Sequence, residues 1–240
     1  NKVNKITTLI EDLVEEKLII NEVTGLKRNT IDKYYTEDNV VKKCMELITA
    51  NLLIDKNDIC IEPSAGNGSF IKYIKYLFTN YIFYDIEPEH NEIIKQDYLD
   101  YNNNNIENYN KKHIIGNPPF GRQSSLAIKF IKKSVEFCDT ISFILPKSFK
   151  KNSLKKHFPL NFHLICEYDL PKDSFIIDNK NYNVPCIFQI WIKKNEDRNI
   201  PEKAYPIKYK FVKKVDNHDI SFRRVGIYAG KIDINTDDKS

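Results

Sequence analysis

The tetrapeptide Asn117-Pro118-Pro119-Phe120 restricts the folding of this chain more than any other stretch. Two consecutive prolines have a fixed φ and no N–H group, so neither can donate to a β ladder. The apolar run 113–115 before them is typical of the end of a buried strand, and residues 122–125 after them suit a helix start. The tetrapeptide is therefore predicted to form a strand-to-helix turn at the carboxyl edge of an open α/β sheet, where ligands collect.

The same residues present two hydrogen-bond acceptors. The Pro118 carbonyl is held rigidly, and Asn117 adds a side-chain carbonyl beside it. Two convergent acceptors suit an –NH2 group whose two hydrogens must both be held. Phe120 provides a flat apolar face for a planar ring that carries such an amine. The alternative is a proline-rich turn with one packed aromatic side chain, because short motifs also occur by chance.

A strand, a glycine-containing loop and a helix are predicted over residues 59–78. Gly66 and Gly68 would let the backbone approach a ligand closely, and the helix that follows favours a negative group at its N-terminus. The loop lacks the third glycine of a dinucleotide-binding turn and the Lys-Ser/Thr pair of a P-loop.

Acidic residues end the next two predicted strands. Asp85 follows the strand 81–84, where an acid is well placed to bind the two hydroxyls of a ribose. Asp97 comes next and could accept a hydrogen bond from an adenine amino group, with Ile86 and Tyr98 on either side of the ring. Each acid alone could equally be a solvated turn residue, and only the ordered series favours a binding site.

Strands alternate with helices along most of the chain, which predicts a largely parallel sheet. Helices are expected at 40–48, with Thr36 or Asp38 as the N-cap, and at 126–137. Further strands are expected at 141–146, 164–168 and 186–191. The last two would form a hairpin, and their long connection, 171–185, is a candidate substrate-facing loop.

Three parts of the chain are expected. They are an N-terminal helical segment at 1–30, one catalytic domain at 31–199 and a short C-terminal extension at 200–240, with short strands near 211–212 and 220–222. No secretory signal and no apolar run of membrane-spanning length occur, so an intracellular protein without membrane contact is expected. No Cys/His spacing suggests a metal site.

The net charge of +4 is compatible with a polyanionic partner without being diagnostic. A group of lysines follows the strand that ends at Leu145: Lys147, Lys150, Lys151, Lys155 and Lys156. These side chains could contact phosphates. A solvated helix face in a lysine-rich protein is an equally open interpretation.

The tetrapeptide, together with Glu62-Pro63 and Gly66-x-Gly68 before it, resembles the S-adenosylmethionine-dependent amino-methyltransferases. The order of the motifs is similar to the gamma type of the DNA N6-adenine methyltransferases. The resemblance covers roughly residues 33–192. It implies a Rossmann-like class I methyltransferase fold of the α/β class: a mostly parallel seven-stranded sheet with helices on both faces and an antiparallel hairpin at one edge.

The resemblance also implies a cofactor, S-adenosylmethionine, and a role for each matching residue. The methionine part would be lined by Glu62, Ser64, Ala65 and Gly66, with Thr36 nearby. Asp85 would bind the ribose, and the adenine would lie against Ile86, Asp97 and Tyr98. The target amine would be held by Asn117 and the Pro118 carbonyl, and Pro119 completes the catalytic tetrapeptide. The target base would stack on Phe120, with Phe175 as a second contact.

The expected activity is methyl transfer to the N6 amine of adenine, with DNA as the favoured substrate. RNA adenine and a protein glutamine also present a planar –NH2 group, and the tetrapeptide does not separate the three substrates. A catalytically inactive, nucleic-acid-binding subunit is a further alternative. No large recognition domain follows the catalytic region, so sequence specificity is expected on a missing segment or a partner subunit. The oligomeric state is not indicated.

Overall fold

The computed structural model describes residues 34–177, 180–199, 207–213, 215–223, 227 and 229–233. The chain divides into two compact units, Asn1–Arg198 and Asn199–Ser240. The helical segment predicted at 1–30 lies outside the described residues.

A seven-stranded sheet forms the centre of the first unit, in the order β4-β3-β2-β5-β6-β10-β7. Its strands are β2 (Ile59–Glu62), β3 (Asn80–Asp85), β4 (Ile94–Lys95), β5 (Lys112–Gly116), β6 (Thr140–Pro146), β7 (Phe162–Asp169) and β10 (Cys186–Lys193). The strands from β4 to β6 are parallel, and β10 pairs antiparallel with both β6 and β7. The predicted sheet, with its antiparallel hairpin at one edge, is confirmed.

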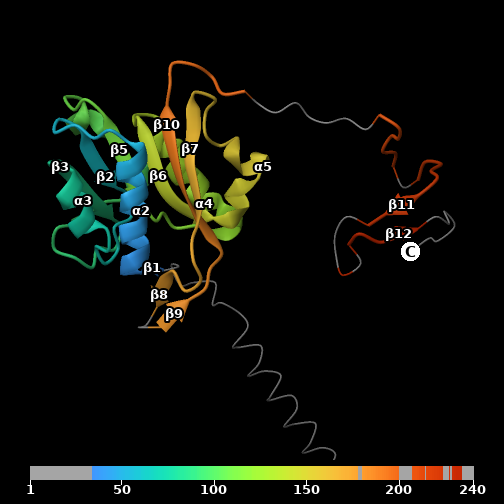
Figure 1. Ribbon diagram of the computed structural model, residues 1–240, viewed down its shortest axis with the longest axis horizontal. Coiled ribbons are helices and arrows are strands. Elements are labelled where there is room, and N and C mark those ends of the chain that lie inside the picture. The colour runs from blue at the N-terminus through green and yellow to red at the C-terminus, as the bar shows by residue number, and fades with distance from the viewer. Residues whose placement is uncertain are drawn as a thin grey trace, which may run out of the picture. The chain divides into compact units, whose positions relative to one another are not determined.

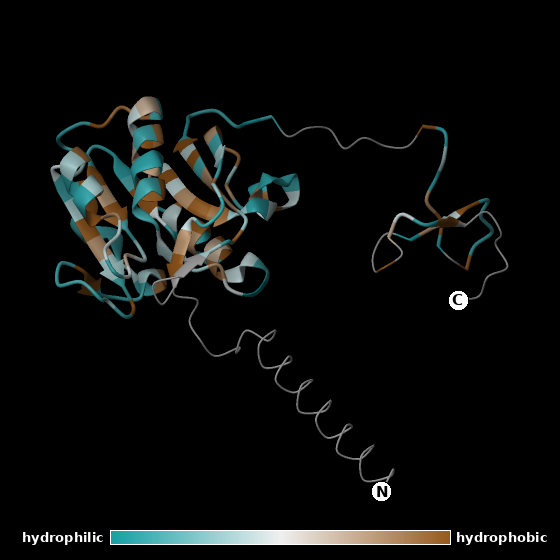
Figure 2. Ribbon diagram, turned by 60° about the horizontal axis from the view of Figure 1, so that its bottom comes forward, coloured by the Kyte–Doolittle hydropathy of each residue, from teal (hydrophilic) through white to brown (hydrophobic). Residues whose placement is uncertain are grey.

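The helices of this unit are α2 (Asp38–Asn51), α3 (Ile71–Leu77), α4 (Ser125–Ser134) and the short α5 (Asn152–Lys155). Figure 1 shows α2 and α3 on the near side of the sheet. Side chains alternate between two hydrophobic clusters because successive residues of a strand point to opposite faces. Cys60 of β2 packs with α2 and α3, whereas Ile59 and Ile61 pack on the α4 side. Figure 2 shows hydrophobic residues concentrated along these strands.

The N-cap of the first described helix lies one residue away from both predicted N-caps. Glu37 caps α2, and its side chain accepts the backbone N–H groups of Asn39 and Val40. The prediction of Thr36 or Asp38 was wrong because the Thr36 hydroxyl is bonded elsewhere, to Asn117. A longer carboxylate can reach the same N–H groups from the position between them.

The connection between β7 and β10 is also different from the prediction. Residues 171–185 were expected to form a substrate-facing loop, but they contain β8 (Phe175–Ile177) and β9 (Lys180–Tyr182). Together with β1 (Tyr35–Thr36) these strands form a separate three-stranded sheet in the order β1-β8-β9. This connection is therefore a structural support for the segment that precedes α2.

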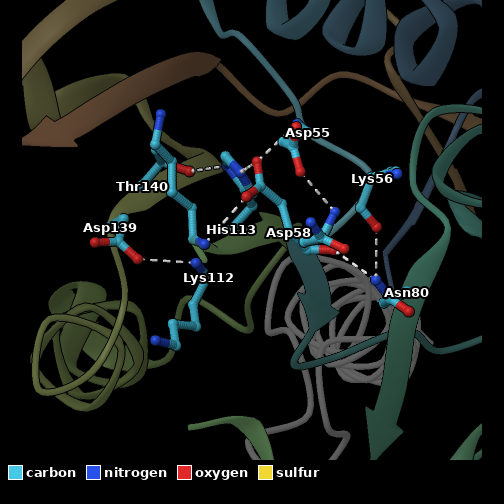
Figure 3. A network of polar contacts seen from close by, with 10 residues as sticks. Asp55, Lys56, Asp58, Asn80, Lys112, His113, Asp139 and Thr140 are labelled. Carbon is cyan, nitrogen blue, oxygen red and sulfur yellow. Dashed lines mark hydrogen bonds and ion pairs between the residues drawn. The ribbon is translucent and has the colours of Figure 1, made fainter. Parts of the chain in front are cut away.

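The edge of the large sheet where its parallel strands begin holds a buried polar network (Figure 3). His113 Nε2 lies 3.2 Å from Asp58 Oδ2, and His113 Nδ1 lies 2.8 Å from Thr140 Oγ1. Burial lowers the pKa of His113 even though the bond to Asp58 favours the imidazolium. The pKa of Asp58 is also lowered: burial acts to raise it, but hydrogen bonds from the Asp55 backbone N–H and from His113 outweigh that effect.

Because the pKa of His113 is lower in the folded than in the unfolded chain, its contribution to stability is present above about pH 6.5 and is lost as the pH falls. We expect the free energy of unfolding to decrease between pH 7.5 and pH 5.5. The loss should be smaller in His113→Gln, which should itself be less stable at pH 7.5. Urea denaturation of both proteins at the two pH values checks this, and equal losses would contradict it, since the other histidines are common to both.

The second unit contains one described pair of strands, β11 (Ser221–Phe222) and β12 (Ile232–Asp233), which is antiparallel. The strand predicted near 220–222 is confirmed, whereas residues 211–212 form no strand. Among the residues that the structure describes in both units, no helix is long and apolar enough to cross a lipid bilayer.

Candidate active site

A cavity of about 280 Å³ opens at the carboxyl ends of β2, β3 and β5. The sheet order reverses between β2 and β5, and ligands bind at such a switch point in open α/β sheets. The wall includes the whole tetrapeptide and all but one of the residues that the sequence placed around a cofactor: Thr36, Glu62, Ser64, Ala65, Gly66, Asp85, Ile86, Asp97, Tyr98, Asn117, Pro118, Pro119 and Phe120.

The side chain of Asn117 is held by the segment before α2. Its Nδ2 donates to the Tyr34 carbonyl at 3.1 Å and to Thr36 Oγ1 at 3.3 Å. A carbonyl can only accept, so the NH2 group must face Tyr34. The Oδ1 atom of Asn117 is then directed away from these two partners and is left as an acceptor at the cavity wall.

The backbone around Asn117 is fixed on both sides. Its carbonyl accepts a hydrogen bond from Ser64 Oγ at 3.1 Å, which ties the turn to the glycine loop. The Pro118 carbonyl accepts no hydrogen bond from the described residues. The Phe120 carbonyl accepts the N–H groups of Leu126 and Ala127 at the start of α4. The half-buried ring of Phe120 packs against both hydrophobic clusters.

The glycine loop after β2 is tied to β3 by a carboxylate. The Gly66 N–H donates to Asp85 Oδ2 at 2.7 Å, and the Glu87 N–H donates to Asp85 Oδ1 at 2.8 Å. Gly66 has a φ of +52°, and an added Cβ would lie 3.4 Å from the ring of Tyr35. This position favours glycine because of its left-handed backbone conformation, since a Cβ there would make only an ordinary contact with Tyr35.

Gly68 differs from the prediction because it does not line the cavity. Its φ is +85°, and an added Cβ would lie 2.8 Å from Ile71 Cδ1. Its contribution is to the turn into α3 and not to ligand contact.

Glu62 is the most unusual side chain at the site. It is 1% exposed, and its Oε2 has no hydrogen-bond partner among the described residues. Burial, followed by the nearby charge of Asp85, raises the pKa of Glu62 well above its ordinary value. A Cβ on Gly116 would come within 3.3 Å of Glu62 Cγ, so glycine there leaves room for the carboxyl group. A buried acceptor without a donor lowers the stability of the folded chain. Glu62 Oε2 is therefore expected to accept a hydrogen bond from a ligand.

Two residues that follow β3 and β4 line the outer part of the cavity. Ile86 is 53% exposed, which leaves an apolar face open. Asp97 Oδ1 accepts the Leu99 N–H at 2.9 Å, while its Oδ2 has no partner among the described residues. Leu99 itself lines the cavity beside them. The sequence interpretation missed Leu99, although its position two residues after the acid was a usable signal.

The ring of Tyr98 does not lie where the sequence placed it. The residue is 1% exposed, its ring packs against Phe130, and its hydroxyl lies 2.9 Å from Ser134 Oγ in α4. The expectation of a tyrosine ring on one side of an adenine is therefore corrected: Tyr98 anchors the turn that carries Asp97 and Leu99.

The prediction that Phe175 is a second contact of the target base is also corrected. Phe175 is 0% exposed and does not line the cavity. Its ring lies edge-on to Tyr34, with centroids 6.1 Å apart. Tyr34 and Tyr35, by contrast, do line the cavity. Phe175 therefore supports Tyr34, whose carbonyl holds Asn117, and is not a direct base contact.

The lysine cluster is largely neutralised by acids on β7. Lys147 Nζ and Lys150 Nζ lie 3.1 and 2.5 Å from the Asp169 carboxylate, and Lys155 Nζ lies 3.0 Å from Glu167 Oε2. Hydrogen bonds from the lysines lower the pKa of Asp169. These pairs do not support the predicted phosphate contacts.

The other two lysines of the cluster, Lys151 and Lys156, are exposed. None of the five lines the cavity. Among the described residues, no group of acidic, His and Cys side chains could hold a metal ion.

Known structures share this fold at low sequence identity. A candidate RNA methyltransferase from Pyrococcus horikoshii is 17% identical with a TM-score of 0.54, over 74% of this chain and 97% of the other. A candidate class I S-adenosylmethionine-dependent methyltransferase from Listeria monocytogenes is 14% identical with a TM-score of 0.53, over 79% and 69%. The methyltransferase subunit of a type I restriction-modification system from Streptococcus thermophilus is 15% identical with a TM-score of 0.50, over 70% and 46%.

The order of the strands is that of the Rossmann-like class I methyltransferase fold, and the cavity lies at the switch point of this sheet. Residues 72–200 match the profile of the EDM2 methyltransferase-like domain, and the chain belongs to that family. No curated protein sequence matches the chain significantly.

Proposed function

We propose that this chain transfers a methyl group from S-adenosylmethionine to the exocyclic N6 amine of adenine in nucleic acid, with DNA as the first substrate to test. The observation that carries the proposal is the pair of acceptors at the strand-to-helix turn. Asn117 Oδ1 is oriented by the two hydrogen bonds of its own NH2 group, and the Pro118 carbonyl beside it has no partner among the described residues. Together they can hold both hydrogens of one amine.

The residues around the cavity fit the proposed cofactor. The unpaired Oε2 of buried Glu62 is an acceptor for the ammonium group of the methionine part. The Asp85 carboxylate is an acceptor for the ribose hydroxyls, since each of its oxygens has a second lone pair. Asp97 Oδ2 can accept from the adenine amino group, and Ile86 with Leu99 offers apolar contact to the ring. The cofactor would supply an electrophilic methyl group on a sulfonium with a good leaving group.

The protein's own part in the reaction is orientation and charge stabilisation. An adenine amine is a poor nucleophile because its lone pair is delocalised into the ring. When Asn117 Oδ1 and the Pro118 carbonyl bind the two N–H bonds, they favour a pyramidal nitrogen whose lone pair points away from them. Orientation of two reactants can lower a barrier by about 7–11 kcal/mol at best. The same oxygens stabilise the positive charge that grows on the nitrogen.

A base in a duplex must leave the stack to reach this turn, which costs a few kcal/mol. Stacking on the half-buried ring of Phe120 would recover about 1–3 kcal/mol, as it does in proteins that bind single strands. One similar structure is named as a candidate RNA methyltransferase, and another as the methyltransferase subunit of a type I restriction-modification system. This supports testing both nucleic acids here.

The proposal is tested by incubating the chain with labelled cofactor and separate DNA, RNA and protein pools, followed by nucleoside and amino-acid mass analysis. Label in N6-methyladenine is expected, with DNA as the better substrate. Label in methylglutamine would overturn the assigned substrate class. A chain that binds cofactor but labels no pool would favour the inactive-subunit alternative.

Thr36 tests whether the orientation of Asn117 matters. Thr36→Val keeps the shape of the side chain and removes one acceptor of the Asn117 NH2 group. We expect kcat to fall about 2- to 10-fold, the equivalent of one net hydrogen bond. Cofactor affinity should remain near that of the unaltered chain. A larger loss of cofactor affinity than of kcat would contradict this and would indicate that Thr36 contacts the cofactor. The control is Thr36→Ser, which keeps the hydroxyl group and should retain the kcat of the unaltered chain.

A further inference from the structure

The second unit exposes several aromatic side chains. In residues 207–213, Tyr209 is 64% exposed and Phe211 is 75% exposed, and Phe222 on β11 is 53% exposed. Neighbouring exposed apolar side chains mark an interaction site more often than isolated ones do, and Tyr209 and Phe211 are neighbours. The rings of Tyr209 and Phe211 lie on the same side of the extended chain, with centroids 5.4 Å apart and planes at 90°.

Lysines are interleaved with these rings. Lys208 and Lys210 alternate with Tyr209 and Phe211, and Lys213 follows two residues later. All three lysines are exposed, and none has a carboxylate partner among the described residues. Figure 2 shows hydrophilic and hydrophobic residues next to one another in this unit. The ring faces and the cations are therefore presented by a single stretch of chain.

The charge balance of the chain points to the same stretch. Of the 37 basic and 33 acidic side chains, 9 and 6 lie in residues 199–240, which leaves 28 and 27 for residues 1–198. The first unit is thus nearly neutral, and three lysines of its cluster are paired with Asp169 and Glu167. A polyanionic ligand would find most of the positive surplus in the second unit.

We propose that residues 207–213 bind single-stranded nucleic acid, with bases stacked on Tyr209 and Phe211 and phosphates held by Lys208, Lys210 and Lys213. This deepens and rests on the proposed function, because it names the part of the chain that holds the substrate strand. Exposed ring faces need unstacked bases, which a single strand offers and a duplex does not. Stacking and phosphate contact are both tolerant of sequence, so this stretch supplies affinity and not a recognition sequence.

Fluorescence anisotropy with a labelled oligothymidine of 15 nucleotides tests the inference on the full chain. Tyr209→Ala with Phe211→Ala should weaken binding at least about tenfold, and Trp at both positions should restore it. Binding should also depend less on salt when Lys208, Lys210 and Lys213 are changed to Ala. The slope of log affinity against log salt concentration should become less negative by about 2, because each of three phosphate contacts on a single strand contributes about 0.7. The matched control changes Lys147, Lys150 and Lys155 to Ala, removes the same formal charge, and should alter that slope little.

Two results would overturn the inference. One is an equal change in the salt dependence of binding for the two triple-lysine variants. The other is an unchanged affinity for oligothymidine after both rings are removed. Oligothymidine has no adenine amine, so its binding is measured apart from methyl transfer. If the chain methylates adenine while the 207–213 variants bind oligothymidine normally, this inference fails and the proposed function stands. If those variants lose binding to oligothymidine but the chain methylates no adenine, this inference stands and the proposed function fails. Unchanged cofactor affinity in every variant verifies that the first unit is folded.

Discussion

Asn117→Ala is expected to abolish methyl transfer, with a loss in kcat of at least about 10²- to 10³-fold and cofactor affinity close to that of the unaltered chain. The estimate follows the effect of removing one preorganised group that stabilises a transition state. Alanine removes the Oδ1 acceptor proposed for the target amine. It leaves the backbone carbonyl of residue 117, to which Ser64 donates, in place.

Asn117→Asp tests whether the NH2 group of Asn117 is needed to orient its side chain. It keeps the size of the side chain and one acceptor oxygen, but it replaces the NH2 group that donates to the Tyr34 carbonyl and Thr36 Oγ1. Two oxygens would then face each other, and the side chain is expected to turn away from its position. Single-turnover transfer measures both variants, and calorimetry measures their cofactor binding. Turnover by Asn117→Ala within a few-fold of the unaltered chain would remove Asn117 from the reaction.

Asp85→Ala is expected to weaken cofactor binding at least about tenfold. The carboxylate accepts the Gly66 and Glu87 N–H groups at 2.7 and 2.8 Å, so its loss releases the glycine loop as well as the acceptors proposed for the ribose. A hydrogen bond to a charged group contributes about 1.5–3 kcal/mol, which corresponds to roughly 10- to 150-fold in a dissociation constant.

The control for this change is Asp100→Ala, which removes an acid of the turn after β4 that does not line the cavity. It should leave cofactor affinity unaltered. Asp85→Asn, which keeps one neutral acceptor oxygen, should lie between Asp85→Ala and the unaltered chain. Calorimetry that gave the same dissociation constant for Asp85→Ala and the unaltered chain would exclude Asp85 from the binding site.

Much of the cavity could be predicted because it is built from strand ends. Glu62, Asp85 and Asn117 each follow a hydrophobic run, and the carboxyl ends of neighbouring parallel strands must meet at one edge of a sheet. The order β4-β3-β2-β5-β6 then brings together residues that lie more than 50 positions apart. These strand ends could be predicted because each hydrophobic run is visible within a few consecutive residues.

The errors arose where a side chain's direction depends on distant partners. The ring of Tyr98 turns inward because Phe130 and Ser134 of α4 receive it. Phe175 lies in a three-residue strand, too short for a visible alternation of apolar residues. Lys150 meets Asp169, 19 residues away on β7, and no local pattern predicts an ion pair at that separation.

The most direct test of the central claim compares two single-stranded oligonucleotides that differ in one atom group. One carries a single adenine, and the other carries purine, which lacks the exocyclic amine, at the same position. Both are incubated with the chain and labelled S-adenosylmethionine, and the nucleosides are then identified by mass. We predict label in the first oligonucleotide alone, recovered as N6-methyladenine. Equal label in both, or label in neither while the chain binds cofactor and strand, would contradict the proposal that Asn117 and Pro118 hold an adenine amine for methylation.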